Sequence, residues 1–173
     1  MLPLVTPSNR HRVATRIPIS KKRKPRLGNR YFGFVDMTGG SSDDATLGIA
    51  HVDRGRTILD LVVSQAGSPP FNPRQAVMKF ANQLRAYGLR NVTGHNYAGL
   101  IFKQDFESFG ISYTPCRVAK SVLYEELEPK FNSGEIELPD IPKLQEQALG
   151  LVVRGARIDH LPGGRGATDQ ASG

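Results

Sequence analysis

The stretch YFGFVDMTGGSSDDATLGIAHV, residues 31–52, guides the interpretation of the rest of the chain. Its two apolar runs are typical of buried β-strands, and a turn rich in Gly, Ser and Asp joins them. The first run ends in a carboxylate, Asp36, which is followed closely by Gly39 and Gly40. Ionising a carboxylate inside a strand is costly unless a cation compensates it. A strand end with little side-chain bulk nearby therefore favours an accessible Asp36.

Two interpretations of Asp36 follow from the local pattern. Carboxylate oxygens at an open strand end suit Mg²⁺ or Mn²⁺. Asp also commonly caps turns, and the local pattern taken alone slightly favours that role. Asp43 and Asp44, in the same turn, are expected to be solvated loop residues. The sequence has no GxxxxGK[ST] motif, so nucleotide hydrolysis by a phosphate-binding loop is not expected.

The hydrophobic periodicity along the chain predicts an α/β fold. Strands are expected at 31–36, 45–52 and 57–65 as an antiparallel meander, with a hairpin turn at the sequence DRG that starts at Asp53. Further elements are expected in the order helix 74–87, strand 92–94, helix 97–109, strand 111–113, helix 119–131, a short extended piece in EIELP, helix 141–153 and strand 157–159. This order predicts a mixed β-sheet flanked by helices.

The chain has 173 residues and a net charge of +7, which is unevenly distributed. Residues 1–30 contain nine Lys and Arg and no acidic residue, whereas the remainder carries 14 basic and 16 acidic residues. We expect residues 1–30 to form a basic, flexible arm or linker and residues 31–173 to form one folded domain. Such an arm binds nucleic acid by neutralising phosphates or is simply a solvated linker, and its sequence fits both.

Several classes of protein are disfavoured by composition. No apolar run is long enough to span a membrane, and we expect no signal peptide at the N-terminus. The single cysteine, Cys116, excludes an internal disulfide and a metal site built from cysteines. A reducing, cytoplasmic setting is therefore expected.

His95 and the C-terminal acids are further candidate ligands. His95 follows the predicted strand 92–94, and it would stand beside Asp36 if that strand neighbours the first one. A histidine at such a position is more commonly a turn residue than a ligand. Asp159, His160 and Asp169 come late in the chain, where an acid could complete a metal site with Asp36. Spacing alone does not demonstrate this.

Four segments, in this order, are similar to motifs of one known family. They are FVDMTGGSSDDATLGIAHV, VTGHNYAGLIFKQDFESFGISY, KSVLYEELEPKFNSGEIELPD and RIDHLPGGRGATDQASG. They resemble an Asp-x-Ser-Gly-Gly segment, a Gly-Asp-x-Tyr-Ala-Gly helix start, a Gly-x-(Ile/Val)-x-Leu-Pro step and a closing Asp-Asp pair. From about residue 31 the chain resembles the C-terminal nuclease domain of phage terminase large subunits, which has an RNase H-like fold.

This resemblance implies an acidic cluster that holds two divalent metals and cuts DNA during genome packaging. By position, the catalytic metal ligands are Asp36, His95 and Asp169, and the cofactor is Mg²⁺ or Mn²⁺. His95 and Thr168 occupy places where the family usually has acids. Because imidazole cannot bridge two metals, a single-metal site or one preferring Mn²⁺ is easier to support. His95 is then a third ligand or a general base, with Asp159 and His160 as compensating candidates.

The resemblance leaves two other functions open. One is a catalytically degenerate module that binds DNA or protein, and the other is a different RNase H-like nuclease such as a junction resolvase. A chain of this length has no room for the ATPase motor of a terminase large subunit, so it is a fragment, a separately encoded domain or a remnant. The expected partners are double-stranded DNA and a separate packaging ATPase or portal protein.

Overall fold

The computed structural model describes residues 22–37, 44–65, 71–142, 144, 151–154 and 157–160, with the backbone alone at 96–100, 120, 151–154 and 157–160. The chain divides into two compact units, which are described separately. The sheet unit, Ile19–Arg117 with Ile136–Pro139, contains β1 (Tyr31–Asp36), β2 (Ala45–Asp53), β3 (Arg56–Gln65), α2 (Pro73–Ala86), β4 (Asn91–Gly94), α3 (Asn96–Ser108), β5 (Ser112–Pro115) and β6 (Ile136–Glu137). The second unit contains α4 (Lys120–Ser133), β7 (Leu151–Arg154) and β8 (Arg157–His160).

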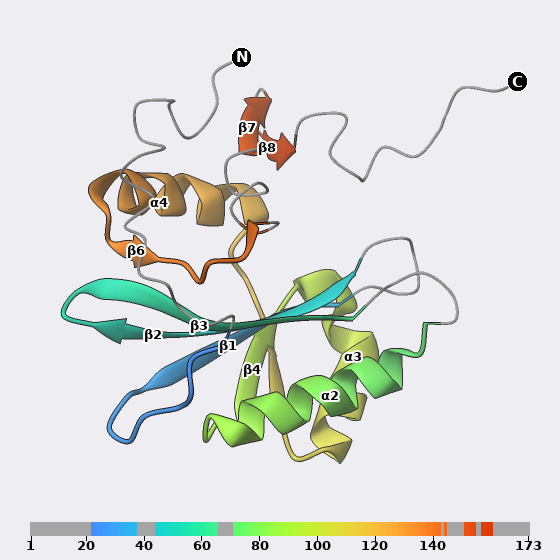
Figure 1. Ribbon diagram of the computed structural model, residues 1–173. Helices are drawn as coiled ribbons and strands as arrows, with labels where there is room; N and C mark the ends of the chain where they lie inside the picture. The colour runs from blue at the N-terminus through green and yellow to red at the C-terminus, as the bar shows by residue number, and fades with distance from the viewer. Residues whose placement is uncertain are drawn as a thin grey trace, which may run out of the picture. The chain divides into compact units, whose positions relative to one another are not determined.

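The six strands of the sheet unit form one mixed sheet in the order β5-β4-β1-β2-β3-β6 (Figure 1). The meander β1-β2-β3 is antiparallel, whereas β4 and β5 run parallel to β1 and β6 runs parallel to β3. The predicted mixed sheet and its antiparallel meander are therefore confirmed. The parallel arrangement of β1, β4 and β5 brings their carboxyl ends to the same edge of the sheet.

A tight hairpin joins β2 to β3, as the DRG sequence predicts. Arg54 and Gly55 occupy the turn with φ values of 49° and 79°. Two successive positive φ values are the conformation that lets a two-residue turn match the twist of antiparallel strands. The strands pair from Ala45 with Gln65 to Asp53 with Arg56, with one register shift at Ile49 and Ala50.

Helices α2 and α3 cover one face of the sheet (Figure 1). The apolar positions of α2 recur at helical spacing and are all buried, as the sequence predicts; they are Ala76, Val77, Phe80, Ala81 and Leu84. Phe106 of α3 and Val35 of β1 are also fully buried. The hydrophobic core thus lies between this helical layer and the sheet.

The predicted helix 141–153 is wrong at its C-terminal end. Leu151–Arg154 forms strand β7, which pairs antiparallel with β8, and Leu151 lies opposite His160. The adjacent β-branched residues Val152 and Val153 favour an extended backbone. The strand expected at 157–159 is confirmed as part of β8.

In the described part of the basic N-terminal segment, Lys22 and Arg23 lie along the outer edge of β3. Lys22 forms an isolated antiparallel bridge with Leu61, and the Arg23 amide donates to the Asp60 carbonyl at 2.8 Å. The Tyr87 hydroxyl donates in turn to the Arg23 carbonyl. Residues 22–30 therefore make specific contacts with the sheet unit, while residues 1–21 lie outside the described ranges. No helix within those ranges is long and apolar enough to cross a membrane.

Candidate active site at the carboxyl ends of β1, β4 and β5

The strand register places Asp36 and His95 side by side. Val35 of β1 pairs with Gly94 of β4 in a parallel ladder. Asp36 and His95 each follow one of these paired residues, so they occupy corresponding positions on neighbouring strands. Neighbouring strands lie about 4.8 Å apart. The adjacency that the sequence predicts for these two residues, on the condition that the strands are neighbours, is therefore confirmed.

Asp36 and His95 also project from the same face of the sheet. Phe34 pairs with Thr93 one step earlier in the ladder, and side chains alternate between faces along a strand. His95 keeps an extended backbone, with φ −60° and ψ 138°, so this alternation continues to its position. Both side chains are exposed. A carboxylate and an imidazole thus follow paired residues of neighbouring strands at an accessible edge of the sheet.

Neither the Asp36 nor the His95 side chain forms a hydrogen bond with the described neighbouring backbone. His95 is the N-terminal capping residue of α3, yet its side chain makes no capping hydrogen bond. Within the described ranges, no hydrogen bond or ion pair involves the Asp36 carboxylate. An exposed carboxylate and an imidazole without a structural role are chemically able to bind a divalent cation.

Tyr113 reaches the same place from the core side of the sheet. It lies on β5, is only 5% exposed, and donates its hydroxyl to the His95 carbonyl at 3.0 Å. A Cβ atom on Gly94 would lie 2.7 Å from the Tyr113 Cζ atom and closer still to its hydroxyl. The Tyr113 ring therefore fills the space beneath β4 that a side chain at position 94 would need.

The electrostatic environment of Tyr113 links it to Asp36. Burial raises the pKa of Tyr113 to about 12, and the charges of Asp36 and Cys116 add to this shift. The hydroxyl is therefore protonated over the physiological pH range and serves as a donor. Cys116 directly follows β5, and its amide donates to the Gly94 carbonyl at 2.7 Å. The ends of all three parallel strands thus contribute to one cluster.

The structure does not describe the side chains of the remaining predicted ligands. Asp169 lies outside the described ranges, as do Thr168 and Asp43, and the side chains of Asp159 and His160 in β8 lie outside them as well. Asp44 is exposed, as expected for a loop residue. In the part of the chain that the structure describes, no three His, Cys, Asp or Glu side chains converge on a metal site. The described residues thus include Asp36 and His95 at corresponding strand ends, and the ligand role of Asp36, His95 and Asp169 stays a prediction.

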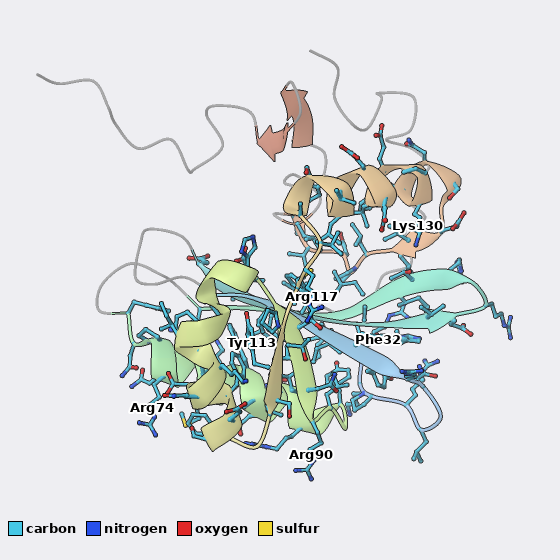
Figure 2. All side chains as sticks on the ribbon, turned by 180° about the vertical axis from the view of Figure 1, so that it is seen from behind. Phe32, Arg74, Arg90, Tyr113, Arg117 and Lys130 are labelled. Carbon is cyan, nitrogen blue, oxygen red and sulfur yellow. The ribbon has the colours of Figure 1, made fainter. Side chains whose placement is uncertain are left out.

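Two residues near the cluster were not predicted from the sequence. In the sequence, Tyr113 is compatible with an ordinary core position. The contact of its hydroxyl with His95, at the start of α3, becomes visible only in the three-dimensional structure. Arg117 follows β5 by two residues and is exposed. Figure 2 shows Arg117 and Arg90 toward opposite ends of β4. The expected strand 111–113 ends two residues before the observed β5 does. A prediction that extended this strand to Pro115 would have placed Arg117 near the site.

Comparison with solved structures identifies the fold. The large terminase nuclease of thermophilic phage G20c superposes with a TM-score of 0.69 at 17% sequence identity, covering 92% of this chain and 90% of that one. The HK97 bacteriophage large terminase superposes with a TM-score of 0.64 at 13% identity. That match covers 87% of this chain and 36% of the HK97 protein. The chain has the RNase H-like fold of large terminase nucleases.

The RNase H-like fold is established by structure alone, since no protein-family model and no curated protein sequence matches the chain. One structure of the G20c nuclease contains bound magnesium, with a TM-score of 0.65 at 18% identity over 83% of this chain and 77% of that chain. Other structures of that nuclease contain cobalt or zinc. The expected RNase H-like sheet flanked by helices is confirmed.

Proposed function

We propose that this protein is a divalent-metal-dependent DNA endonuclease domain of the terminase type, acting in phage genome packaging. The observation that carries the proposal is the register of β1 and β4, which sets Asp36 and His95 side by side on one face of the sheet. The likeness to terminase nuclease structures, one with bound magnesium, supports this assignment. In this role the domain would act on double-stranded DNA in the host cytoplasm, together with a separate packaging ATPase or portal protein.

The residues present fit a divalent metal in part. Asp36 and His95 would hold it, and Asp169 would complete the ligand set. Mg²⁺ or Mn²⁺ held by these residues would supply Lewis-acid chemistry, polarising the scissile phosphate and lowering the pKa of a water. The one imidazole ligand favours Mn²⁺ over Mg²⁺, since imidazole suits transition metals. His95 could alternatively accept a proton from that water, because a neutral imidazole nitrogen can act as a general base.

Among the residues whose side chains the structure describes, Arg117 is a basic residue placed to hold the DNA backbone at this site. The last pair of the β4-β5 ladder is Gly94 with Pro115, so Arg117 leaves the sheet at the edge that carries His95. Its side chain is exposed and makes no hydrogen bond or ion pair with any described residue. An arginine with unused donors binds phosphate oxygens in a bidentate manner.

A second candidate function is a nuclease-like module that binds DNA without cutting it. The observation in its favour is His95, an imidazole at a position where the resembling family usually has an acid. Neutral imidazole brings no negative charge and cannot bridge two metals. The two functions predict opposite responses to substitution at this position.

Cleavage of supercoiled plasmid DNA in Mg²⁺ and in Mn²⁺ tests the proposal. We expect the wild type to nick or linearise the plasmid and Asp36→Ala to lose this activity by about 100-fold or more. Asp53→Ala is the matched control, because Asp53 is also an exposed carboxylate at a strand end. It ends β2, which is antiparallel to β1, so it lies at the opposite edge of the sheet. Equal background cleavage by all three proteins in both metals would rule out the nuclease.

Restoring acids at the two unusual positions separates the two candidate functions. In an active enzyme, the double substitution His95→Asp and Thr168→Asp should change the cleavage rate little or lower it. In a degenerate module the same substitutions should create cleavage that the wild type lacks. DNA binding measured in parallel, without metal, shows whether each variant still engages its substrate.

A further inference from the structure

Tyr113 is a buried polar residue at the candidate site that the roles above do not use. Its hydroxyl donates to the His95 carbonyl at 3.0 Å, and its ring packs against Phe106 of α3 with the ring centroids 5.6 Å apart. A phenylalanine ring would fill the same space in the core without a hydroxyl. Burying the tyrosine hydroxyl is costly unless it is hydrogen-bonded. The hydroxyl of Tyr113 is directed at the backbone of a proposed metal ligand.

Gly94 makes this contact sterically possible. A Cβ atom at position 94 would lie 2.7 Å from both the Tyr113 Cζ atom and the Val35 Cγ2 atom. Because position 94 has no side chain, the Tyr113 ring extends from β5 beneath β4 toward β1. The tyrosine thereby reaches from β5 past β4 to the His95 carbonyl.

The position of the His95 side chain depends on its backbone. Within the described residues the imidazole makes no hydrogen bond, so no side-chain partner holds it in place. The Tyr113 hydroxyl is the side-chain donor that the structure places on the His95 carbonyl. Groups that orient metal ligands in this way commonly change metal affinity or activity 10- to 100-fold when they are removed.

We propose that Tyr113 is a positioning residue: its hydroxyl holds the His95 backbone at the start of α3 and so sets where the imidazole stands beside Asp36. This inference rests on the proposed function in so far as His95 acts as a metal ligand. The effect on the His95 ring is independent of that function, since it concerns the metal-free protein.

Tyr87 provides a matched control elsewhere in the sheet unit. Like Tyr113 it is buried, and its hydroxyl also donates to a backbone carbonyl, that of Arg23. Burial, followed by the charges of Asp60 and Tyr31, raises the pKa of Tyr87 to about 12 as well. Its ring packs against Tyr31, at the start of β1, whereas Asp36 ends that strand. Tyr87 thus has equivalent chemistry at the other end of β1.

The test compares Tyr113→Phe with Tyr87→Phe in the full chain. We expect Tyr113→Phe to shift the His95 ring resonances in NMR spectra of the metal-free protein and to weaken Mn²⁺ binding about tenfold. In plasmid cleavage it should lower kcat and leave KM for DNA unchanged. Tyr87→Phe, which also loses one buried hydrogen bond, should leave all three quantities at their wild-type values. Incorporation of 4-aminophenylalanine at position 113 restores a donor and should recover Mn²⁺ affinity.

The possible outcomes separate this inference from the proposed function. Unchanged His95 resonances in a folded Tyr113→Phe protein, or equal shifts in the two phenylalanine variants, would overturn the positioning role. If the wild type neither binds Mn²⁺ nor cuts DNA, the proposed function fails, and the metal-free spectra alone decide the role of Tyr113. If Tyr113→Phe does not fold, recovery of His95 resonances by 4-aminophenylalanine, with its donor in place, supports the inference, and their displacement overturns it.

Discussion

Position 94 is the place where one added methyl group should be most harmful to the sheet. Ala at this position would bring its Cβ atom within 2.7 Å of both Val35 and the Tyr113 ring, which are themselves buried. We expect Gly94→Ala to lower the free energy of unfolding by about 1–3 kcal/mol, as overpacking does. Urea denaturation followed by circular dichroism measures this loss.

Gly48 in β2 is the control for that substitution. A Cβ atom there would lie 3.7 Å from the nearest heavy atom, a Leu59 methyl carbon, which is ordinary van der Waals contact. Gly48→Ala should therefore leave stability unchanged or raise it slightly, because alanine restricts the unfolded chain. Equal losses in the two variants would contradict the close packing inferred beneath Gly94.

Arg117 and Arg90 form a second matched pair of single residues. Both are exposed arginines next to strands of the sheet, but Arg90 precedes β4 and Arg117 follows β5 (Figure 2). We expect Arg117→Ala to weaken DNA binding and to lower the slope of log K against log salt by about 1, the signature of one lost phosphate contact. Fluorescence anisotropy over a salt series measures both quantities. Arg90→Ala should have a smaller effect, and an equal effect would show that the DNA does not track the candidate site.

At the scale of elements, the start of α2 is fixed by one side chain. The Asn72 carboxamide oxygen accepts from the amides of Arg74 and Gln75 at 3.0 and 3.3 Å, and Pro73 opens the helix. Asn72→Ala should cost about 1 kcal/mol of stability, the usual cost of losing an N-terminal cap. Asn72→Asp keeps the acceptor and should retain wild-type stability in the same urea titration. A loss of equal size in Asn72→Asp would mean that the cap is not the cause.

The same element shows what could be predicted from sequence. Helix α2 combines a capping residue, a proline at its first position and a full apolar stripe, so all local signals agree. The segment 141–153 has no such agreement, because Val152 and Val153 favour a strand while the surrounding residues fit a helix. The antiparallel partner that decides for the strand is β8, and pairing between separate segments is not visible in local periodicity.

At the scale of the whole molecule, the candidate site depends on strand order. The sequence predicts Asp36 and His95 at strand ends, but their adjacency requires β4 to lie next to β1, which no local pattern reveals. The contact of Tyr113 with His95 depends in addition on the register of β5 and on the space beneath Gly94. The candidate ligands at strand ends were therefore predictable, whereas the buried Tyr113, proposed to position one of them, was not.

In the sheet unit the buried acid Asp60 and the proposed metal ligand Asp36 lie at different places along the strands. Asp60 is 2% exposed, and its carboxylate lies 2.6 Å from the Nδ1 atom of His51, which is 6% exposed. The ring of Tyr31 packs edge-on against His51 with the centroids 5.4 Å apart. This pair lies near the start of β1, where Tyr31 is opposite His51, whereas Asp36 ends that strand in solvent.

Substituting the two acids should therefore give opposite phenotypes. Asp60→Ala leaves a buried imidazole without its partner and should cost roughly 3 kcal/mol of unfolding free energy, because breaking a buried polar pair is expensive. The folded fraction should still cut DNA at the wild-type rate. Asp36→Ala should change stability by less than about 0.5 kcal/mol, as exposed substitutions do, while abolishing cleavage. Urea titrations paired with plasmid cleavage, normalised to folded protein, measure both effects. A fully folded Asp60→Ala protein that cuts DNA more slowly than the wild type would contradict this expectation. It would show that the buried Asp60–His51 pair influences the site at the other end of β1.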